Sequence, residues 1–295
     1  DANGLRDDLA VPFIDWGYDR GDGPVNGANN LYYRLGLKAL VFWCDLVGDD
    51  GLAAEARLLE QQISQLMGAW FDTMLNDLDP WPGIGYHAAV LGLAQGFVPK
   101  ARQEECLGYI KQHILDCFPN RQDAPRNSAP DVASRQLITP YFAHYALPVL
   151  IEHGQMAFVL DQYRVCWGYA MAEGRTTWLE VFDPRWSHCH QWSGCPTWQL
   201  SRYVLGLWPR CDLGARHFEF RFEPGNLTHA RGRLPLPGEG KTIAVEWRRT
   251  GTSIEYRIES PCTVDVQGLK TQNMSGTPVG VSGTYHVTLS ETDFG

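Results

Sequence analysis

The chain has 295 residues, of which 44% are hydrophobic and 20% are charged, so it is long enough to bury one large core or two modest ones. Its formal net charge of −9 offers no basic field that would attract a nucleic acid. No apolar run reaches the length of a membrane-spanning helix. We therefore expect neither a nucleic-acid partner nor a membrane partner.

Residues from about 28 to 208 are predicted to be helical, because apolar side chains recur there at helical spacing. The first such segment ends at Gly48-Asp49-Asp50-Gly51, a helix-breaking turn, after which the same period resumes. Pro119–Pro130 is polar and is predicted to be a loop. The predicted helices are Asn29–Val47, Leu52–Phe71, Tyr86–Gln95, Arg102–Phe118, Ala133–His153, Met156–Glu173 and Pro196–Leu207. Such paired segments predict a series of helical hairpins.

The hydrophobic period changes to two from His217 onward, which predicts strands. In His217–Glu223 the three phenylalanines Phe218, Phe220 and Phe222 fall on one face. The further predicted strands are Thr242–Trp247, Ser253–Ile258, Cys262–Val266 and Tyr285–Leu289. We therefore expect an α plus β protein with two domains, a helical domain over residues 1–212 and an antiparallel β-sandwich over residues 213–295.

The segment Gly174–Leu207 contains the strongest functional signal. A single glutamate, Glu180, lies there among Trp178, Trp186, Trp192 and Trp198, with His188 and His190 close by. Aromatic rings stack on the apolar face of a sugar, and a carboxylate can transfer a proton or activate a water molecule. The pattern favours a sugar-processing pocket, with a buried tryptophan-rich helix junction as the alternative.

Several motifs, taken in this order, resemble those of the α-L-rhamnosidases, a family of glycoside hydrolases with a six-hairpin (α/α) barrel. The Thr-Thr-x-x-Glu and Ala-Arg-Gly signatures are the most specific of them in combination. The matching segments are Phe13-Ile14-Asp15-Trp16, Asn29–Tyr33 with Leu40, Tyr86–Leu93, Gly174–Glu180, Ser187–Pro196 with Tyr203–Gly206, and Leu227–Pro237. The resemblance covers most of the chain and implies the barrel and an inverting hydrolase of terminal α-L-rhamnosides.

The resemblance also implies the roles of particular residues. Glu180 would be the general base that deprotonates the attacking water. The implied carbohydrate-binding residues are Asp15, Trp16, Trp178, His188, His190 and Trp192, with His190 favoured over His188 as the histidine beside the base. No cofactor is implied.

In the family the general acid lies in an acidic, arginine-rich segment before the F-x-D-W loop. This chain begins just before that loop, so we expect an incomplete barrel and a missing N-terminal part of the enzyme as partner. One alternative is therefore a non-catalytic carbohydrate-binding fragment or a separated portion of a larger glycosidase. Another is a different (α/α)-barrel polysaccharide-degrading enzyme, for which Tyr141, His144 and Tyr145 are candidate residues.

Metal binding is not expected from the cysteines and histidines near Glu180. His188, Cys189 and His190 are adjacent, so they cannot all point at one ion, and no further pair completes a tetrahedral set. A disulfide between Cys189 and Cys195 is an alternative in an oxidising compartment. The sequons at Asn226 and Asn273 favour an extracellular or secreted protein.

Overall fold

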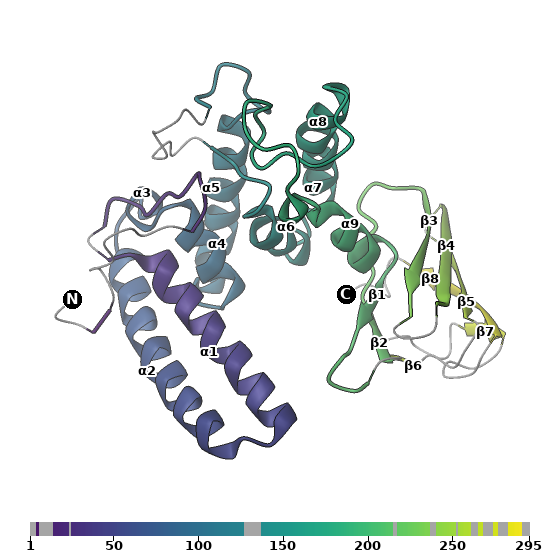
Figure 1. The fold of residues 1–295 in the computed structure, drawn as a ribbon, viewed down its shortest axis with the longest axis horizontal. Coiled ribbons are helices and arrows are strands. Elements are labelled where there is room, and N and C mark those ends of the chain that lie inside the picture. Colours follow the sequence, from purple (N-terminus) through teal and green to yellow (C-terminus); the bar gives the residue numbers. More distant parts are fainter. Residues whose placement is uncertain are drawn as a thin grey trace. The chain divides into compact units, whose positions relative to one another are not determined.

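The structure, a computed structural model, describes residues 4–5, 14–23, 25–126, 137–214, 217–236, 240–251, 253–260, 265–267, 274–276 and 283–290. Helices occupy the first part of the chain and strands the second (Figure 1). The chain forms two compact units, Asp1–Val149 with Val165–Ser193, and Leu150–Arg164 with Gly194–Gly295. These units are divided by packing and not by type of secondary structure, and the expected boundary after residue 212 stays a prediction.

The expected helices are present, with shifted ends. They are α1 (Gly27–Val47), α2 (Asp50–Met74), α3 (Trp81–Ile84), α4 (Tyr86–Ala94), η1 (Lys100–Arg102), α5 (Gln103–Asp116), α6 (Ala143–Glu152), α7 (Met156–Gln162), η2 (Tyr163–Trp167), α8 (Gly168–Ala172), η3 (Gln191–Ser193), α9 (Cys195–Gln199) and η4 (Leu200–Val204). Within the described ranges, no helix has the length and apolar character needed to cross a bilayer.

Helices α1 and α2 lie side by side as a hairpin (Figure 1). Gly48 ends α1 with a left-handed φ of 78°, and the Asp49 side chain accepts a 3.1 Å hydrogen bond from the Leu52 N–H at the start of α2. A glycine suits the first position because it has no Cβ, and an aspartate suits the second because its oxygen caps a free N–H. The predicted turn therefore forms for the expected local reasons.

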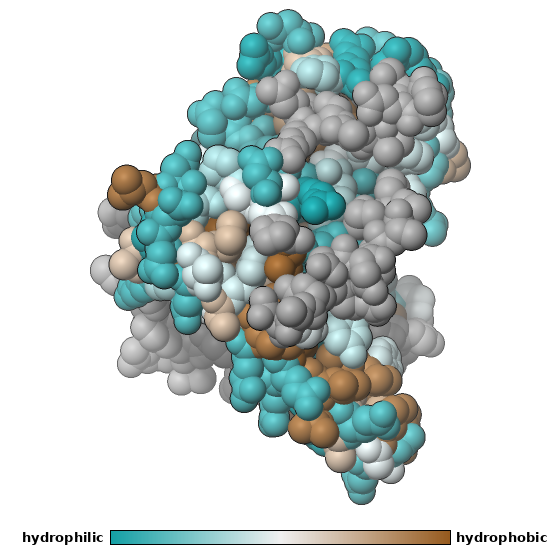
Figure 2. All heavy atoms as spheres, turned by 90° about the vertical axis from the view of Figure 1, so that its left-hand side faces the viewer, coloured by the Kyte–Doolittle hydropathy of each residue, from teal (hydrophilic) through white to brown (hydrophobic). Residues whose placement is uncertain are grey.

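Several apolar side chains of this hairpin are exposed. Figure 2 shows apolar residues gathered at the lower end of the hairpin, where α1 meets α2. The exposed apolar side chains of the two helices are Tyr33, Leu40, Phe42, Trp43, Leu46, Val47, Leu52, Leu58 and Leu59. Other side chains of α1, including Leu37 and Cys44, are buried.

A loop over residues 14–23 packs against α3 and α4. The Gly23 N–H donates a 3.1 Å hydrogen bond to the Gly83 carbonyl, and the backbone of Gly21 approaches Gly85 closely. Gly85 has φ +81°, and a Cβ there would lie 2.4 Å from the Gly21 nitrogen. Only a glycine fits this approach, which positions the loop that carries Asp15 and Trp16.

Three predicted helices are shorter or less regular than expected. The one predicted over Pro196–Leu207 is divided into α9 and the π-helical turn η4, and Leu207 begins β1. The segment predicted over Ala133–His153 becomes helical only at Ala143, because the residue before Pro140 disfavours the helical region. Residues 133–136 lie outside the described residues. The segment predicted over Met156–Glu173 is divided by η2, a π-helical turn. Periodicity cannot reveal such a turn, because it inserts a residue without changing composition.

The strands form two sheets. They are β1 (Leu207–Pro209), β2 (His217–Phe220), β3 (His229–Pro235), β4 (Thr242–Thr250), β5 (Ser253–Ser260), β6 (Asp265–Gln267), β7 (Met274–Gly276) and β8 (Gly283–Ser290). The larger sheet is antiparallel with order β3-β4-β5-β8-β7, and the smaller has order β1-β2-β6. In the smaller sheet β2 and β6 are parallel, unlike the purely antiparallel arrangement that we expected. Parallel neighbours need a long connection, which here includes β3, β4 and β5.

One face of the larger sheet is buried. Trp247 and Tyr256 are almost fully buried, and the Trp247 indole N–H donates a 2.8 Å hydrogen bond to the Val204 carbonyl. A Cβ at Gly232 would lie 2.4 Å from Leu205, so the glycine lets this leucine pack against β3. The α plus β class is therefore confirmed. The six-hairpin barrel and the β-sandwich, which are more specific architectures, stay predictions.

Candidate functional site

Glu180 lies in a loop that folds back on itself. The Glu180 N–H donates a 2.9 Å hydrogen bond to the Ser187 carbonyl, and the His190 N–H donates a 3.0 Å hydrogen bond to the Trp178 carbonyl. The Ser193 hydroxyl donates a 2.6 Å hydrogen bond to the Leu179 carbonyl. Since Leu179 and the following Val181 are buried, the backbone on both sides of Glu180 is anchored in the core. This anchoring fixes the position of the Glu180 backbone, from which the carboxylate extends.

The carboxylate of Glu180 is turned inward, with 13% of its side chain exposed. Its Oε1 accepts a 2.7 Å hydrogen bond from the Trp16 indole N–H, and the His190 Nε2 lies 3.9 Å from the same oxygen. Among the described residues, Oε2 has no hydrogen-bond partner. One oxygen is therefore held in place while the other is available to a ligand or a water molecule.

Aromatic rings surround the carboxylate. Trp16 and Trp186 have ring centroids 5.1 Å apart, while Trp192 lies 4.5 Å from His190 and 5.7 Å from Tyr141. These separations fall within the usual range for interacting rings. Flat apolar surfaces next to a carboxylate are suited to a ligand with one apolar and one polar face.

These side chains enclose a cavity of about 330 Å³. Its volume is at the lower end of the range typical of small-molecule sites. The lining residues are Ile14, Asp15, Trp16, Thr139, Tyr141, Glu180 and Trp192, all within the first compact unit. The tertiary structure thus brings the loop near residue 15, the segment before α6 and the Glu180 loop to one place.

Asp15 is buried and accepts several hydrogen bonds. Its Oδ1 accepts a 2.9 Å bond from the Gly17 N–H, and its Oδ2 accepts a bond from the Thr139 hydroxyl. The His87 Nδ1 accepts the Asp19 N–H at 3.2 Å, so the proton lies on Nε2, which donates to Asp15 Oδ1 at 3.3 Å. Both oxygens of Asp15 therefore act as acceptors within the protein.

Tyr141 contributes a phenol to the cavity. Burial, with a further contribution from a hydrogen bond with Tyr145, raises its pKa to about 12. The phenol consequently keeps its proton at neutral pH and can donate a hydrogen bond. From α6, the His144 Nε2 donates a 2.6 Å hydrogen bond to the Trp192 carbonyl, which holds the tryptophan opposite Tyr141.

The remaining predicted site residues lie outside the cavity lining. Trp178 is half-buried and contributes its carbonyl to the loop. His188 is exposed, and its Nε2 donates a 2.5 Å hydrogen bond to the Pro184 carbonyl. Of the two histidines, His190 is therefore the one beside Glu180. Phe13, part of the first matching motif, lies outside the described residues.

The sequence did not indicate two residues of this site. Thr139 lines the cavity, and His87 contacts Asp15. Thr139 was assigned to a helix, although Pro140 directly after it indicates an extended residue. His87 was assigned only to a helix motif, and nothing in the sequence spacing connects it with Asp15. Its contact with the carboxylate depends on how the loop over residues 14–23 packs on α4.

Metal ligands do not converge in the part of the chain that the structure describes. Within those ranges, no group of three His, Cys, Asp or Glu side chains lies close enough to hold an ion. Cys189 is exposed, Cys195 is buried, and both are free thiols, so the disulfide alternative is wrong for this structure.

Two solved structures are similar to this chain. The GH78-family rhamnosidase of Bacillus sp. GL1 matches it with a TM-score of 0.66 and 22% identity, over 90% of this chain and 28% of that one. The α-L-rhamnosidase from Dictyoglumus thermophilum matches with a TM-score of 0.62 and 17% identity, over 95% of this chain and 34% of that one. No family model and no curated protein matches the sequence.

The structural similarity confirms, for the fold, the resemblance that the motifs indicated. At these identities it establishes the fold and no more. The chain spans about a third of the length of the structures that it matches.

Proposed function

We propose that this chain takes part in the inverting hydrolysis of terminal α-L-rhamnosides, with Glu180 as the general base. The observation that carries the proposal is the state of the Glu180 carboxylate. Its Oε1 accepts the Trp16 indole N–H at 2.7 Å, its Oε2 has no partner among the described residues, and the side chain lines a cavity of about 330 Å³. A carboxylate held by one oxygen can direct the other at a water molecule.

The cavity walls support a sugar as the ligand. Trp16 and Trp192 provide apolar ring faces, while Tyr141 provides a hydroxyl group at the same cavity. A pyranose presents C–H groups on one face and hydroxyls at its edge, so rings and hydrogen-bonding groups in one cavity complement it. In this proposal His190, whose Nε2 lies 3.9 Å from Glu180 Oε1, lies beside the base.

The general acid is the part that the described residues do not supply. Inverting glycosidases hold their two carboxyl groups roughly 6.5–9.5 Å apart and use one of them to protonate the leaving group. Among the described residues that line this cavity, Asp15 is the second carboxylate, but both of its oxygens accept hydrogen bonds within the protein. It therefore suits the binding of the sugar or the support of the loop better than proton donation.

The decisive experiment uses a rhamnoside that does not need a general acid. We expect the full chain to hydrolyse 2,4-dinitrophenyl α-L-rhamnoside, since this leaving group departs without protonation. Glu180→Gln should lower kcat by about 10²- to 10⁴-fold, the usual contribution of a general base. Nuclear magnetic resonance of the first product should show the inverted anomer. Unchanged turnover in Glu180→Gln, or a retained anomer, contradicts the proposal.

A second candidate is a carbohydrate-binding function without catalysis, favoured by the engagement of both Asp15 oxygens. It predicts that L-rhamnose binds the wild type and Glu180→Gln with similar affinity, while neither protein hydrolyses the activated rhamnoside. Calorimetric titration with L-rhamnose, performed beside the turnover assay, separates the two functions. Turnover that depends on Glu180 excludes the binding-only function.

A further inference from the structure

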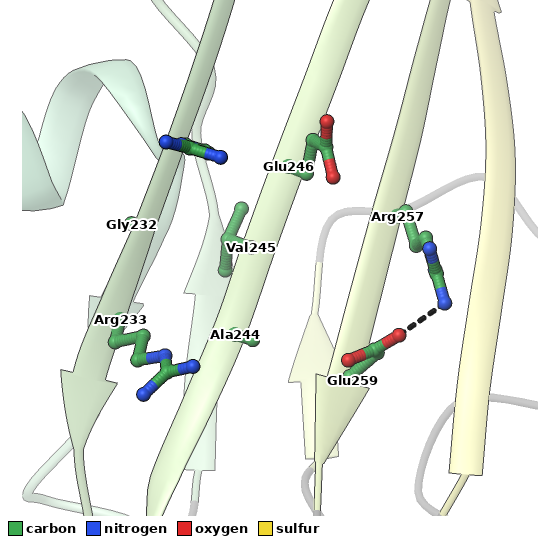
Figure 3. A pocket seen from close by; sticks show the side chains of 8 residues that line it. Gly232, Arg233, Ala244, Val245, Glu246, Arg257 and Glu259 are labelled. Carbon is green, nitrogen blue, oxygen red and sulfur yellow. Dashed lines mark hydrogen bonds and ion pairs between the residues drawn. The ribbon is translucent and has the colours of Figure 1, made fainter.

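The exposed face of the larger sheet carries a second hollow, unrelated to the Glu180 cavity. Along β3, β4 and β5 the buried residues alternate with exposed ones, and the exposed ones are largely charged. Figure 3 shows this face from close by. The hollow measures about 430 Å³ and is lined by Arg231, Gly232, Arg233, Ala244, Val245, Glu246, Arg257 and Glu259.

Strand register explains why the hollow forms. Ala244 stands opposite Arg233 on β3 and Glu259 on β5, so a single methyl group separates two long side chains in that row. In the neighbouring row Glu246 stands opposite Arg231 and Arg257. Directly opposed side chains in a sheet are close neighbours. The small side chain of Ala244 therefore leaves an empty space between the long side chains of Arg233 and Glu259.

Three charged groups in this hollow have no ionic partner on the described part of the chain. Arg257 and Glu259 form an ion pair, drawn as a dashed line in Figure 3. Arg231, Arg233 and Glu246 form neither an ion pair nor a side-chain hydrogen bond with any described residue. The two arginines are two residues apart on β3, so their Cα atoms are about 7 Å apart and both side chains lie on one face.

We propose that this hollow binds the carboxylate groups of a uronate-containing polysaccharide. A guanidinium presents a planar fork of donors that matches a carboxylate, and two such forks on one strand can grip two successive acidic groups. The described residues of the lining include no aromatic ring on which a neutral sugar would stack, so we expect recognition through charge and hydrogen bonds.

Glu246 limits the class of ligand further. Its carboxylate lies in the row between Arg231 and Arg257 and has no described partner. It repels densely charged polymers such as nucleic acids or highly sulfated glycans, but it accepts hydrogen bonds from sugar hydroxyls that separate the carboxylates of a polyuronate. The net charge of −9 opposes every polyanion, and it opposes those with the highest charge density most strongly.

The test is affinity electrophoresis of the full chain in gels that contain polygalacturonate, dextran or dextran sulfate. We expect polygalacturonate to retard the wild type, dextran to have no effect and dextran sulfate to retard it less than polygalacturonate. The double variant Arg231→Gln/Arg233→Gln should bind polygalacturonate at least about tenfold more weakly, because two charge-assisted contacts are lost. Glu246→Gln should bind it more tightly.

Arg248→Gln is the control. This substitution removes one positive charge, where the double variant removes two, from an exposed position on β4 that does not line the hollow. It should bind polygalacturonate like the wild type. The proposal is overturned if wild-type mobility is unchanged in polygalacturonate, if dextran retards the protein equally, if dextran sulfate retards it as much or more, or if Arg248→Gln loses as much affinity as the double variant. Rhamnoside turnover depends on other residues, so either proposal can fail without the other.

Discussion

The indole N–H of Trp16 donates a 2.7 Å hydrogen bond to the Glu180 carboxylate, joining two residues that are 164 positions apart. This bond connects the first described loop of the chain with the tryptophan-rich loop. It constrains one oxygen of Glu180, while the other has no hydrogen-bond partner among the described residues. The arrangement suggests that Trp16 acts by positioning the carboxylate, which can be tested separately from its role as a ring surface.

Trp16→Phe keeps an aromatic face but removes the N–H donor. We expect kcat on the activated rhamnoside to fall roughly 10- to 100-fold, since a hydrogen bond to a charged group contributes about 1.5–3 kcal/mol. KM should change less than about twofold, because the ring that faces the sugar remains. Trp43→Phe, at a 59% exposed position on α1, is the control and should behave as wild type. A change confined to KM would show that Trp16 serves only as a binding surface.

The Thr139 hydroxyl supports a buried carboxylate, and its loss should destabilise the fold. It donates to Asp15 and accepts a 3.2 Å hydrogen bond from the Phe142 N–H. Thr139→Val leaves both groups without this partner, so we expect the free energy of unfolding to fall by about 1–3 kcal/mol in urea denaturation. Thr139→Ser retains the hydroxyl and should lose less than about 1 kcal/mol. Equal losses in the two variants would mean that packing of the methyl group dominates.

The ring of His113 links stability to pH. It stacks on Tyr86 with centroids 3.9 Å apart, and its burial lowers its pKa from 6.5 to about 4. Above pH 6.5 the ring is neutral in both the folded and the unfolded states. As the pH falls toward 4, the unfolded state binds a proton that the folded state does not, so stability decreases, by at most about 3 kcal/mol.

His113→Phe keeps the stacked ring and removes the titration. Urea denaturation of both proteins between pH 7 and pH 4 should show a smaller loss of stability in the variant. Parallel pH profiles for wild type and variant would show that His113 does not contribute to this dependence.

Two glycines in helices should respond to alanine in opposite directions. A Cβ at Gly92 in α4 would lie 2.1 Å from the Phe71 ring, so Gly92→Ala should cost about 1–3 kcal/mol through overpacking. Gly108 in α5 has no heavy atom within 4 Å of such a Cβ. Gly108→Ala should therefore stabilise the protein by about 0.5–1 kcal/mol, because alanine has the higher helix propensity. Thermal denaturation of both variants provides the measurement, and a stabilising Gly92→Ala would contradict the packing shown here.

The helices were predictable where local signals and periodicity agreed. The turn at Gly48 and Asp49 combines a left-handed glycine with a capping aspartate, and both act within a few residues of themselves. The start of α6 and the π-helical turn η2 were not predicted correctly, because the first depends on the residue before Pro140 and the second inserts a residue without a compositional signal. The parallel pairing of β2 with β6 could not be predicted from the sequence either, because it joins strands that are distant in the chain.

The sequence by itself determined the order of helices and strands and indicated Glu180, among its tryptophans, as a candidate, because these depend on residue types and short-range spacing. Only the tertiary structure decided that Trp16 donates a hydrogen bond to Glu180 and that Thr139 and His87 donate hydrogen bonds to Asp15. It also decided that His190, and not His188, lies beside the Glu180 carboxylate. These contacts join segments far apart in the chain, and their geometry follows from packing that no local pattern encodes.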